Sequence, residues 1–170
     1  MHHSLLLAGT LFVVLVACSN PQPATDPAAD KAAVLATLNA ETVAAFSRDY
    51  DAWQDKWVHE PYVTKTYMNF ADSSMTETLG WAEVDQFVVD YFAAHPDPDP
   101  LPTPLRDIDV RLYGSGAHVS YEQDDPARGR KRETRLMERV GNEWKIAGME
   151  TVTYGTRTCL IKNREKFGIR

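Results

Sequence analysis

The sequence predicts one α+β domain in which N-terminal helices pack on an antiparallel sheet. Apolar residues recur at helical spacing over residues 28–48 and again over residues 81–94. Apolar and polar residues then alternate from residue 105 to residue 154, where glycine-containing turns interrupt them. Helices that precede a run of antiparallel strands are typical of α+β folds rather than α/β folds.

The beginning of the domain is expected to be helical. Residues 28–48 are rich in alanine, which favours helix, and Asp30 is placed to act as an N-cap or a first-turn acid. A second short helix is expected over residues 49–57, where Trp53 and Trp57 are four residues apart and share a face. The predicted apolar stripe of the first helix consists of Val34, Leu35, Leu38, Ala45 and Phe46.

A strand pair and a third helix are expected after Pro61, which we expect to end the second helix. Residues 62–70 alternate and contain many β-formers, and a turn at 71–74 precedes a short return strand over 75–78. Gly80 interrupts this pattern before the helix at 81–94. The predicted apolar side of that helix consists of Trp81, Val84, Val88, Tyr91 and Phe92.

Four antiparallel strands are expected in the last third of the chain. Residues 95–104 contain five prolines, which forbid helix and central strand, so we expect a stiff surface loop. The strands that follow are predicted at 105–113, 117–121, 133–140 and 143–154, with tight turns at 114–116 and 141–142. The basic run at 128–132 follows Asp124 and Asp125, and we interpret it as a solvated hairpin.

The N-terminus resembles a bacterial lipoprotein signal peptide. Residues 5–17 form an apolar run that is shorter than the about 20 residues of a membrane-spanning helix, and Cys18 follows Ala17 as in a lipobox. The first four residues contain no Lys or Arg, so an ordinary signal peptide or an uncut anchor stays open. We expect a signal peptide at 1–17, a lipidated N-terminus and tether at 18–28, the domain at 29–155 and a C-terminal tail at 156–170.

This organisation predicts a protein of the cell envelope. Lipidation of Cys18 would anchor it to a membrane, the outer membrane in a Gram-negative host, and secretion is the alternative. The formal net charge is −6, and an acidic domain without a basic stripe argues against nucleic acid as a partner. With Cys18 acylated, Cys159 has no disulfide partner, and no metal-site spacing occurs. No cofactor is expected, and the lipid anchor is the only membrane contact expected.

Two stretches of sequence resemble the NTF2-like (SnoaL-like) superfamily. Residues 133–146 are similar to its penultimate hairpin, which has an arginine-containing strand, a glycine turn and then Trp-Lys-Ile. Residues 46–53 are similar to the turn between its first two helices. The resemblance covers roughly residues 29–155. It implies a cone in which a curved antiparallel sheet wraps around the first helix and encloses an apolar pocket, and it leaves the activity open, because this superfamily contains enzymes, adaptors and ligand binders.

Polar groups in such a pocket are candidates for function. His59 lies at the helix-to-strand junction, where a residue that titrates near neutrality could transfer protons, although it could also only bridge that junction. Arg135 and Met137 share one face of their strand, and Arg135 could bind a carboxylate or pair with Glu133 or Glu122. Asp85 could face the pocket mouth, but we favour a solvated helix surface. The full set of pocket candidates is Trp53, Trp57, His59, Tyr62, Tyr67, Trp81, Tyr91, Arg135 and Met137.

Three functions are compatible with these residues. We favour an envelope-anchored domain that binds a small hydrophobic ligand in an aromatic-lined cone pocket. The alternatives are a cofactor-free enzyme of the SnoaL or isomerase kind that uses His59 for proton transfer, and a module that forms homodimers through its sheet. Core packing is the competing explanation for the aromatic residues.

Overall fold

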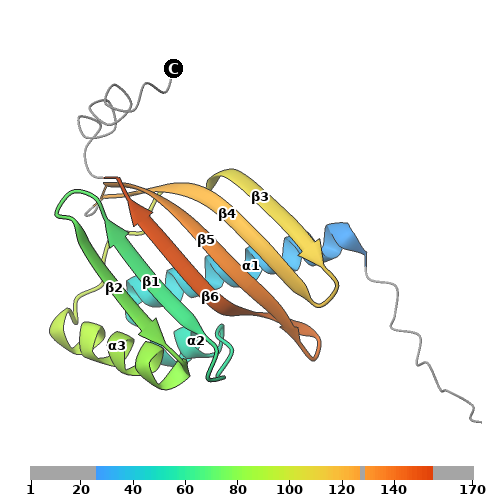
Figure 1. Ribbon diagram of the computed structural model, residues 1–170, viewed down its shortest axis with the longest axis horizontal. Helices are drawn as coiled ribbons and strands as arrows, with labels where there is room; N and C mark the ends of the chain where they lie inside the picture. The colour runs from blue at the N-terminus through green and yellow to red at the C-terminus, as the bar shows by residue number, and fades with distance from the viewer. Residues whose placement is uncertain (1–25, 127–128, 155–170) are drawn as a thin grey trace, which may run out of the picture.

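The computed structural model describes residues 26–126 and 129–154 and shows helices packed on one curved sheet (Figure 1). The predicted signal peptide, Cys18, Cys159 and the tail at 156–170 lie outside the described residues. The elements are α1 (Pro27–Ser47), α2 (Tyr50–Gln54), β1 (Thr64–Asn69), β2 (Ser74–Leu79), α3 (Trp81–Ala94), β3 (Arg106–Tyr113), β4 (Gly116–Asp125), β5 (Gly129–Val140) and β6 (Glu143–Thr153).

The six strands form a single sheet in the order β2-β1-β6-β5-β4-β3. The expectation of a purely antiparallel sheet is wrong at one position, because β1 pairs with β6 in parallel, with Thr64 opposite Gly148. Strands β1 and β2 come early in the chain, whereas β3 to β6 form the later meander. The two groups join where β1 lies beside β6, the last strand of the meander. Such a pairing of distant segments leaves no turn signal in the sequence.

Helix α1 lies across the concave face of the sheet (Figure 1). Asp26 caps its N-terminus by accepting a hydrogen bond from the Ala28 amide (2.9 Å), so the cap is Asp26 and Asp30 is the first-turn acid. Asp30 is buried and pairs with Arg139 of β5, which ties the first turn of the helix to the sheet. Val34 and Leu38 of the same face are almost completely buried in the core.

Helix α2 is shorter than expected and ends at Gln54, well before Pro61. After it, the backbone forms a bridge to the sheet, where the Val58 amide donates to the carbonyl of Ile146 (2.9 Å). This strand-like pairing explains why the helix stops, because these residues satisfy their backbone groups on β6. Strand β5 begins at Gly129, earlier than the predicted residue 133, so most of the basic run lies in a strand.

None of the described helices is both long enough and apolar enough to cross a membrane.

Candidate functional site

A cavity of about 290 Å³ lies between the sheet, α1 and α3. Strand alternation explains its lining, because residues two apart on a strand point to the same face. On β5 this places Lys131, Glu133 and Arg135 on the buried face, and on β1 it places Lys65 and Tyr67 there. The aromatic residues of the lining are Phe46, Trp53, Tyr67, Phe87, Tyr91 and Phe92.

Glu133 is the centre of the charged part of this lining. Its carboxylate accepts hydrogen bonds from the Tyr121 hydroxyl (2.6 Å) and from Arg135 Nη2 (2.6 Å), and it forms an ion pair with Lys131 Nζ (2.6 Å). Burial acts to raise the pKa of Glu133, but Arg135 and Lys131 outweigh it and hold that pKa well below its usual range. Glu133 is therefore ionised and fixes both cations on the concave face.

Arg135 is held on its other side by α1. Its Nη2 lies 3.5 Å from Glu41, and Glu41 also accepts a hydrogen bond from Trp53 Nε1 (3.0 Å). Two buried polar atoms of the lining nevertheless have no hydrogen-bond partner among the described residues: Arg135 Nη1 and Thr151 Oγ1. Such groups cost about 1–3 kcal/mol each when they are left unsatisfied. They offer hydrogen bonds to an acceptor that enters this region.

Lys65 is the cation of the lining that makes no ion pair within the described part of the chain. Its Nζ instead lies 5.2–5.8 Å from the ring centres of four aromatic residues. Burial lowers the pKa of Lys65 to about 8, while Glu41 and Glu133 act to raise it and Arg135 acts to lower it. An ammonium with this low pKa and no carboxylate partner is suited to an anion or to a reaction of the free amine. The four rings belong to Trp53, Trp57, Tyr67 and Phe87.

One side of the cavity is bounded by the end of α1 and the proline-rich loop. Arg48 adopts a left-handed backbone (φ 63°) and its Nη2 forms an ion pair with Asp99 (2.8 Å). Its guanidinium also lies 5.2 Å from the ring centre of Tyr91 and 5.4 Å from that of Phe92. The Asp99 amide donates to the Phe46 carbonyl (2.9 Å), so the loop is fixed to the helix at this point.

Four of the predicted pocket residues line the cavity: Trp53, Tyr67, Tyr91 and Arg135. Trp57 and Trp81 each pack 5.7 Å from Trp53, ring centre to ring centre, and are not among the lining residues. Met137 shares the face of Arg135 as expected, but it is buried in the core. The alternation was therefore correct, and the position along the strand decides which side chain reaches the cavity.

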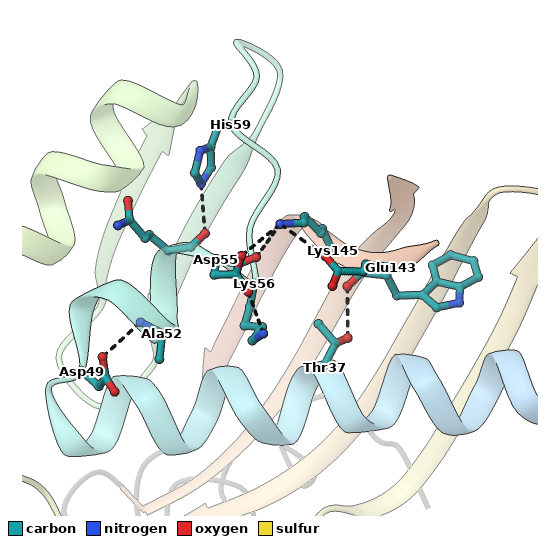
Figure 2. Close-up of polar contacts among 10 residues, drawn as sticks. Thr37, Asp49, Ala52, Asp55, Lys56, His59, Glu143 and Lys145 are labelled. Atoms are coloured by element: carbon teal, nitrogen blue, oxygen red, sulfur yellow. Dashed lines mark hydrogen bonds and ion pairs between the residues drawn. The ribbon is translucent and has the colours of Figure 1, made fainter. Parts of the chain in front are cut away.

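The structure places His59 outside the cavity, which corrects its assignment as a pocket residue. The exposed side chain stacks on Trp81 (3.9 Å between ring centres). Its Nε2 lies 2.9 Å from the Gln54 carbonyl at the end of α2, a contact drawn in Figure 2. This arrangement is the bridge across the helix-to-strand junction that the sequence left open. Tyr62 is also outside, because it is exposed and donates to Glu138 (2.7 Å).

Two expectations about charged residues also change. Lys131 belongs to the basic run interpreted as a solvated hairpin, yet it is buried against Glu133. Asp85 is partly buried rather than only solvated, and it accepts a short hydrogen bond from Tyr50. The predicted Arg135–Glu133 pair is confirmed, whereas Glu122 pairs with Arg130 instead.

The sequence reasoning missed Lys65, Glu41 and Glu133 as site residues. The alternation that linked Arg135 to Met137 also includes Glu133 and Lys131, so this signal was available. Lys65 alternates with Tyr67 in the same way. For Glu41 no such signal exists, because a glutamate on an alanine-rich helix usually faces solvent. No cluster of three or more His, Cys, Asp or Glu suited to a metal occurs among the described residues.

Comparison with known proteins identifies the fold. No family model matches the sequence, and no curated protein matches it. An NTF2-like protein of unknown function from Shewanella baltica OS155 aligns with a TM-score of 0.59 at 15% identity, over 78% of this chain and 99% of that chain. An NTF2-like protein of unknown function from Pseudomonas putida KT2440 gives 0.60 at 14% identity, over 77% and 92%.

The chain has the NTF2-like fold. A third solved structure, described as a "putative dehydratase from the NTF2-like family" of Streptomyces avermitilis, gives a TM-score of 0.60 at 16% identity, over 75% of this chain and 98% of that chain. At sequence identities this low, the structural similarity establishes only that the fold is shared. Because the NTF2-like fold carries many unrelated activities, the function has to be argued from the cavity.

Replacement of the central carboxylate should destabilise the fold. Glu133→Gln leaves Lys131 buried without its counter-charge and leaves Arg135 only the more distant Glu41 (3.5 Å), so we expect a loss of about 3–5 kcal/mol in unfolding free energy near pH 7. The pKa of Glu133 is lowered in the folded state, so its stabilisation is present above the unfolded value of about 4.3 and is lost as pH falls below it. Urea unfolding at several pH values measures both effects.

The matched control for this prediction is Glu150→Gln on the exposed face of β6. We expect it to change the unfolding free energy by less than about 0.5 kcal/mol at any pH. Equal effects of the two substitutions would show that Glu133 has no special role.

Lys65 should give stability a distinct dependence on alkaline pH. The unfolded chain, with a lysine pKa of about 10.4, binds more protons than the folded chain, whose Lys65 has a pKa of about 8. The unfolding free energy of the wild type should therefore rise relative to Lys65→Met between about pH 8 and pH 10.5, by roughly 3 kcal/mol. The exposed Lys31→Met serves as the control, and a parallel pH dependence of wild type and Lys65→Met would contradict the prediction.

Proposed function

We propose that this chain binds a small organic acid with an apolar body in the cavity between the sheet and helices α1 and α3. The carrying observation is the ammonium of Lys65, which lines an aromatic cavity and makes no ion pair within the described residues. A ligand carboxylate would supply the missing counter-charge. Charge-assisted hydrogen bonds of this kind are stronger than neutral ones, because the acceptor is ionised.

The rest of the polar lining supports an acceptor of this type. Arg135 Nη1 and Thr151 Oγ1 lack partners among the described residues, and both side chains line the same cavity as Lys65. Glu133 keeps Arg135 in place through two hydrogen bonds, of 2.6 Å and 3.1 Å. The donors are therefore held in position before a ligand arrives, which reduces the ordering cost of binding.

The aromatic wall supports an apolar body for the ligand. Tyr67 and Phe87 lie 5.8 Å apart, and Tyr91 and Phe92 lie 6.3 Å apart, measured between ring centres. A volume of about 290 Å³ suits a small molecule, and a mostly apolar lining with few polar groups is typical of ligand sites. The enzyme hypothesis based on His59 lacks comparable support, because that residue lies outside the cavity.

Paired ligands test this proposal. We expect 3-phenylpropanoate to raise the melting temperature of the protein and to bind more tightly than 3-phenylpropanol, which has the same ring without the charge. Lys65→Met should weaken the acid by about 10- to 100-fold and leave the alcohol nearly unchanged, because it removes a charged hydrogen bond. Isothermal titration calorimetry measures both affinities.

His59→Ala is the control for that experiment, because His59 is exposed and separate from the cavity; its affinity for the acid should equal that of the wild type. Equal binding of acid and alcohol to the wild type, or an acid preference that survives Lys65→Met, would contradict the proposal.

We also propose that the domain is held at the cell envelope through Cys18. The lipobox-like residues Leu15, Ala17 and Cys18 support this localisation. Two or three acyl chains anchor a protein stably, whereas one chain binds reversibly. Radiolabelled palmitate should be incorporated into the wild type and lost in Cys18→Ser, with Cys159→Ser as the control that keeps the label. Undiminished labelling of Cys18→Ser would refute the anchor.

A homodimer through the sheet is a separate proposal. The face of the sheet opposite α1 exposes Leu136 of β5 and Met75 of β2, both more than half exposed. Both side chains border the same hollow of that face, and contiguous exposed apolar surface is typical of association sites.

A further inference from the structure

Lys65 is held in a fixed position by the sheet. It is the second residue of β1, which lies between two other strands, and it pairs with Thr78 of β2 on one side and Met149 of β6 on the other. Its carbonyl also accepts a hydrogen bond from the Thr78 hydroxyl (3.1 Å). The backbone is therefore paired on both sides, and the side chain starts from a rigid base inside the domain.

The amine of Lys65 differs in its surroundings from the exposed Lys31 and from the three other described lysines, which form ion pairs. Lys131 is engaged by Glu133 at 2.6 Å, and Lys56 and Lys145 form ion pairs with Asp55 at 2.8 Å and 3.4 Å. Lys65 instead lies over aromatic rings and lines the cavity, with no ion pair within the described residues. Desolvation in an apolar pocket is one way in which proteins activate a lysine as a nucleophile.

We propose that the Lys65 amine captures a small apolar aldehyde or ketone as a Schiff base inside the cavity. This rests on the proposed function in one respect, because the same cavity must admit a small molecule with an apolar body. The two ligand classes differ in what they need from Lys65. A carboxylate uses its protonated form, whereas a carbonyl compound uses its free amine.

The reaction balances without an oxidant or a reductant. The nitrogen lone pair of Lys65 attacks the carbonyl carbon and gives a carbinolamine, and loss of water then leaves a carbon–nitrogen double bond. Both hydrogens of the released water come from the amine, and its oxygen comes from the carbonyl. Lys65 is only 5% exposed, so bulk water has limited access to the product, which slows its hydrolysis.

The burial of Lys65 supports a supply of free amine at neutral pH. Burial lowers the pKa of Lys65 to about 8, so about one-tenth of the side chain is unprotonated at pH 7, far more than for an exposed lysine. The acids that oppose this shift are Glu41 of α1 and Glu133 of β5, and both already have other partners. The groups that face Lys65 are Glu41, Trp53, Trp57, Tyr67, Phe87, Lys131, Glu133 and Arg135.

Reductive trapping tests the proposal. The purified full chain is incubated at pH 7 with 3-phenylpropanal and sodium cyanoborohydride, which reduces the Schiff base to a stable secondary amine. Peptide mass spectrometry then locates the adduct. We expect Lys65 to be labelled at least 10-fold faster than the exposed Lys31, with a rate that rises around pH 8. Excess 3-phenylpropanoate should protect Lys65 and leave Lys31 unaffected.

Two variants complete the test. Lys65→Arg keeps the charge and removes the nucleophile, and Lys65→Met suits the aromatic surroundings if the arginine disturbs folding; both should lose the fast label. Lys31→Arg is the control that retains it. Labelling spread evenly over the lysines, or no adduct at Lys65, overturns the proposal. If 3-phenylpropanoate still stabilises the wild type in that case, the proposed acid binding stands alone, and if it does not, both fail.

Discussion

The buried carboxylate of Glu133 holds the charged side of the cavity together. It compensates Lys131 and Arg135 at 2.6 Å each and accepts the hydroxyl hydrogen bond of Tyr121. These two buried cations lie on either side of Glu133 along one strand and would otherwise repel each other in a medium of low polarity. Because Lys131, Glu133 and Arg135 occupy every second position of β5, all three side chains point to the same face. One strand therefore supplies both the cations and their counter-charge.

This arrangement determines what is left for a ligand. Glu133 and Glu41 are already engaged with Lys131, Arg135 and Trp53. The ammonium of Lys65 is therefore surrounded by aromatic rings instead of carboxylates, and it is available to a ligand that enters the cavity. A buried lysine in this state is unfavourable for folding at neutral pH, and natural proteins retain such groups mainly where function requires them.

The edge of the cavity depends on a different constraint. Helix α1 ends at Ser47, and Arg48 turns the backbone into the left-handed region, from which its side chain reaches Asp99 and the rings of Tyr91 and Phe92. The proline-rich loop is stiff, so this anchoring places it beside α1 without a regular element. The loop and α3 thus complete the wall that the sheet leaves open.

The sequence alone was sufficient for the α+β class, for the three helices and for most strand positions, because local periodicity and turn residues carry that information. It also predicted Trp53, Tyr67, Tyr91 and Arg135 as cavity residues, and the pair of Arg135 with Glu133. Only the tertiary structure decided the parallel pairing of β1 with β6, because contact between distant strands leaves no local pattern. The same holds for Lys65 and His59. Their placement depends on which helix covers each strand. His59, which was chosen for its chemistry, therefore lies outside the cavity, whereas Lys65, which was not predicted as a site residue, lines it.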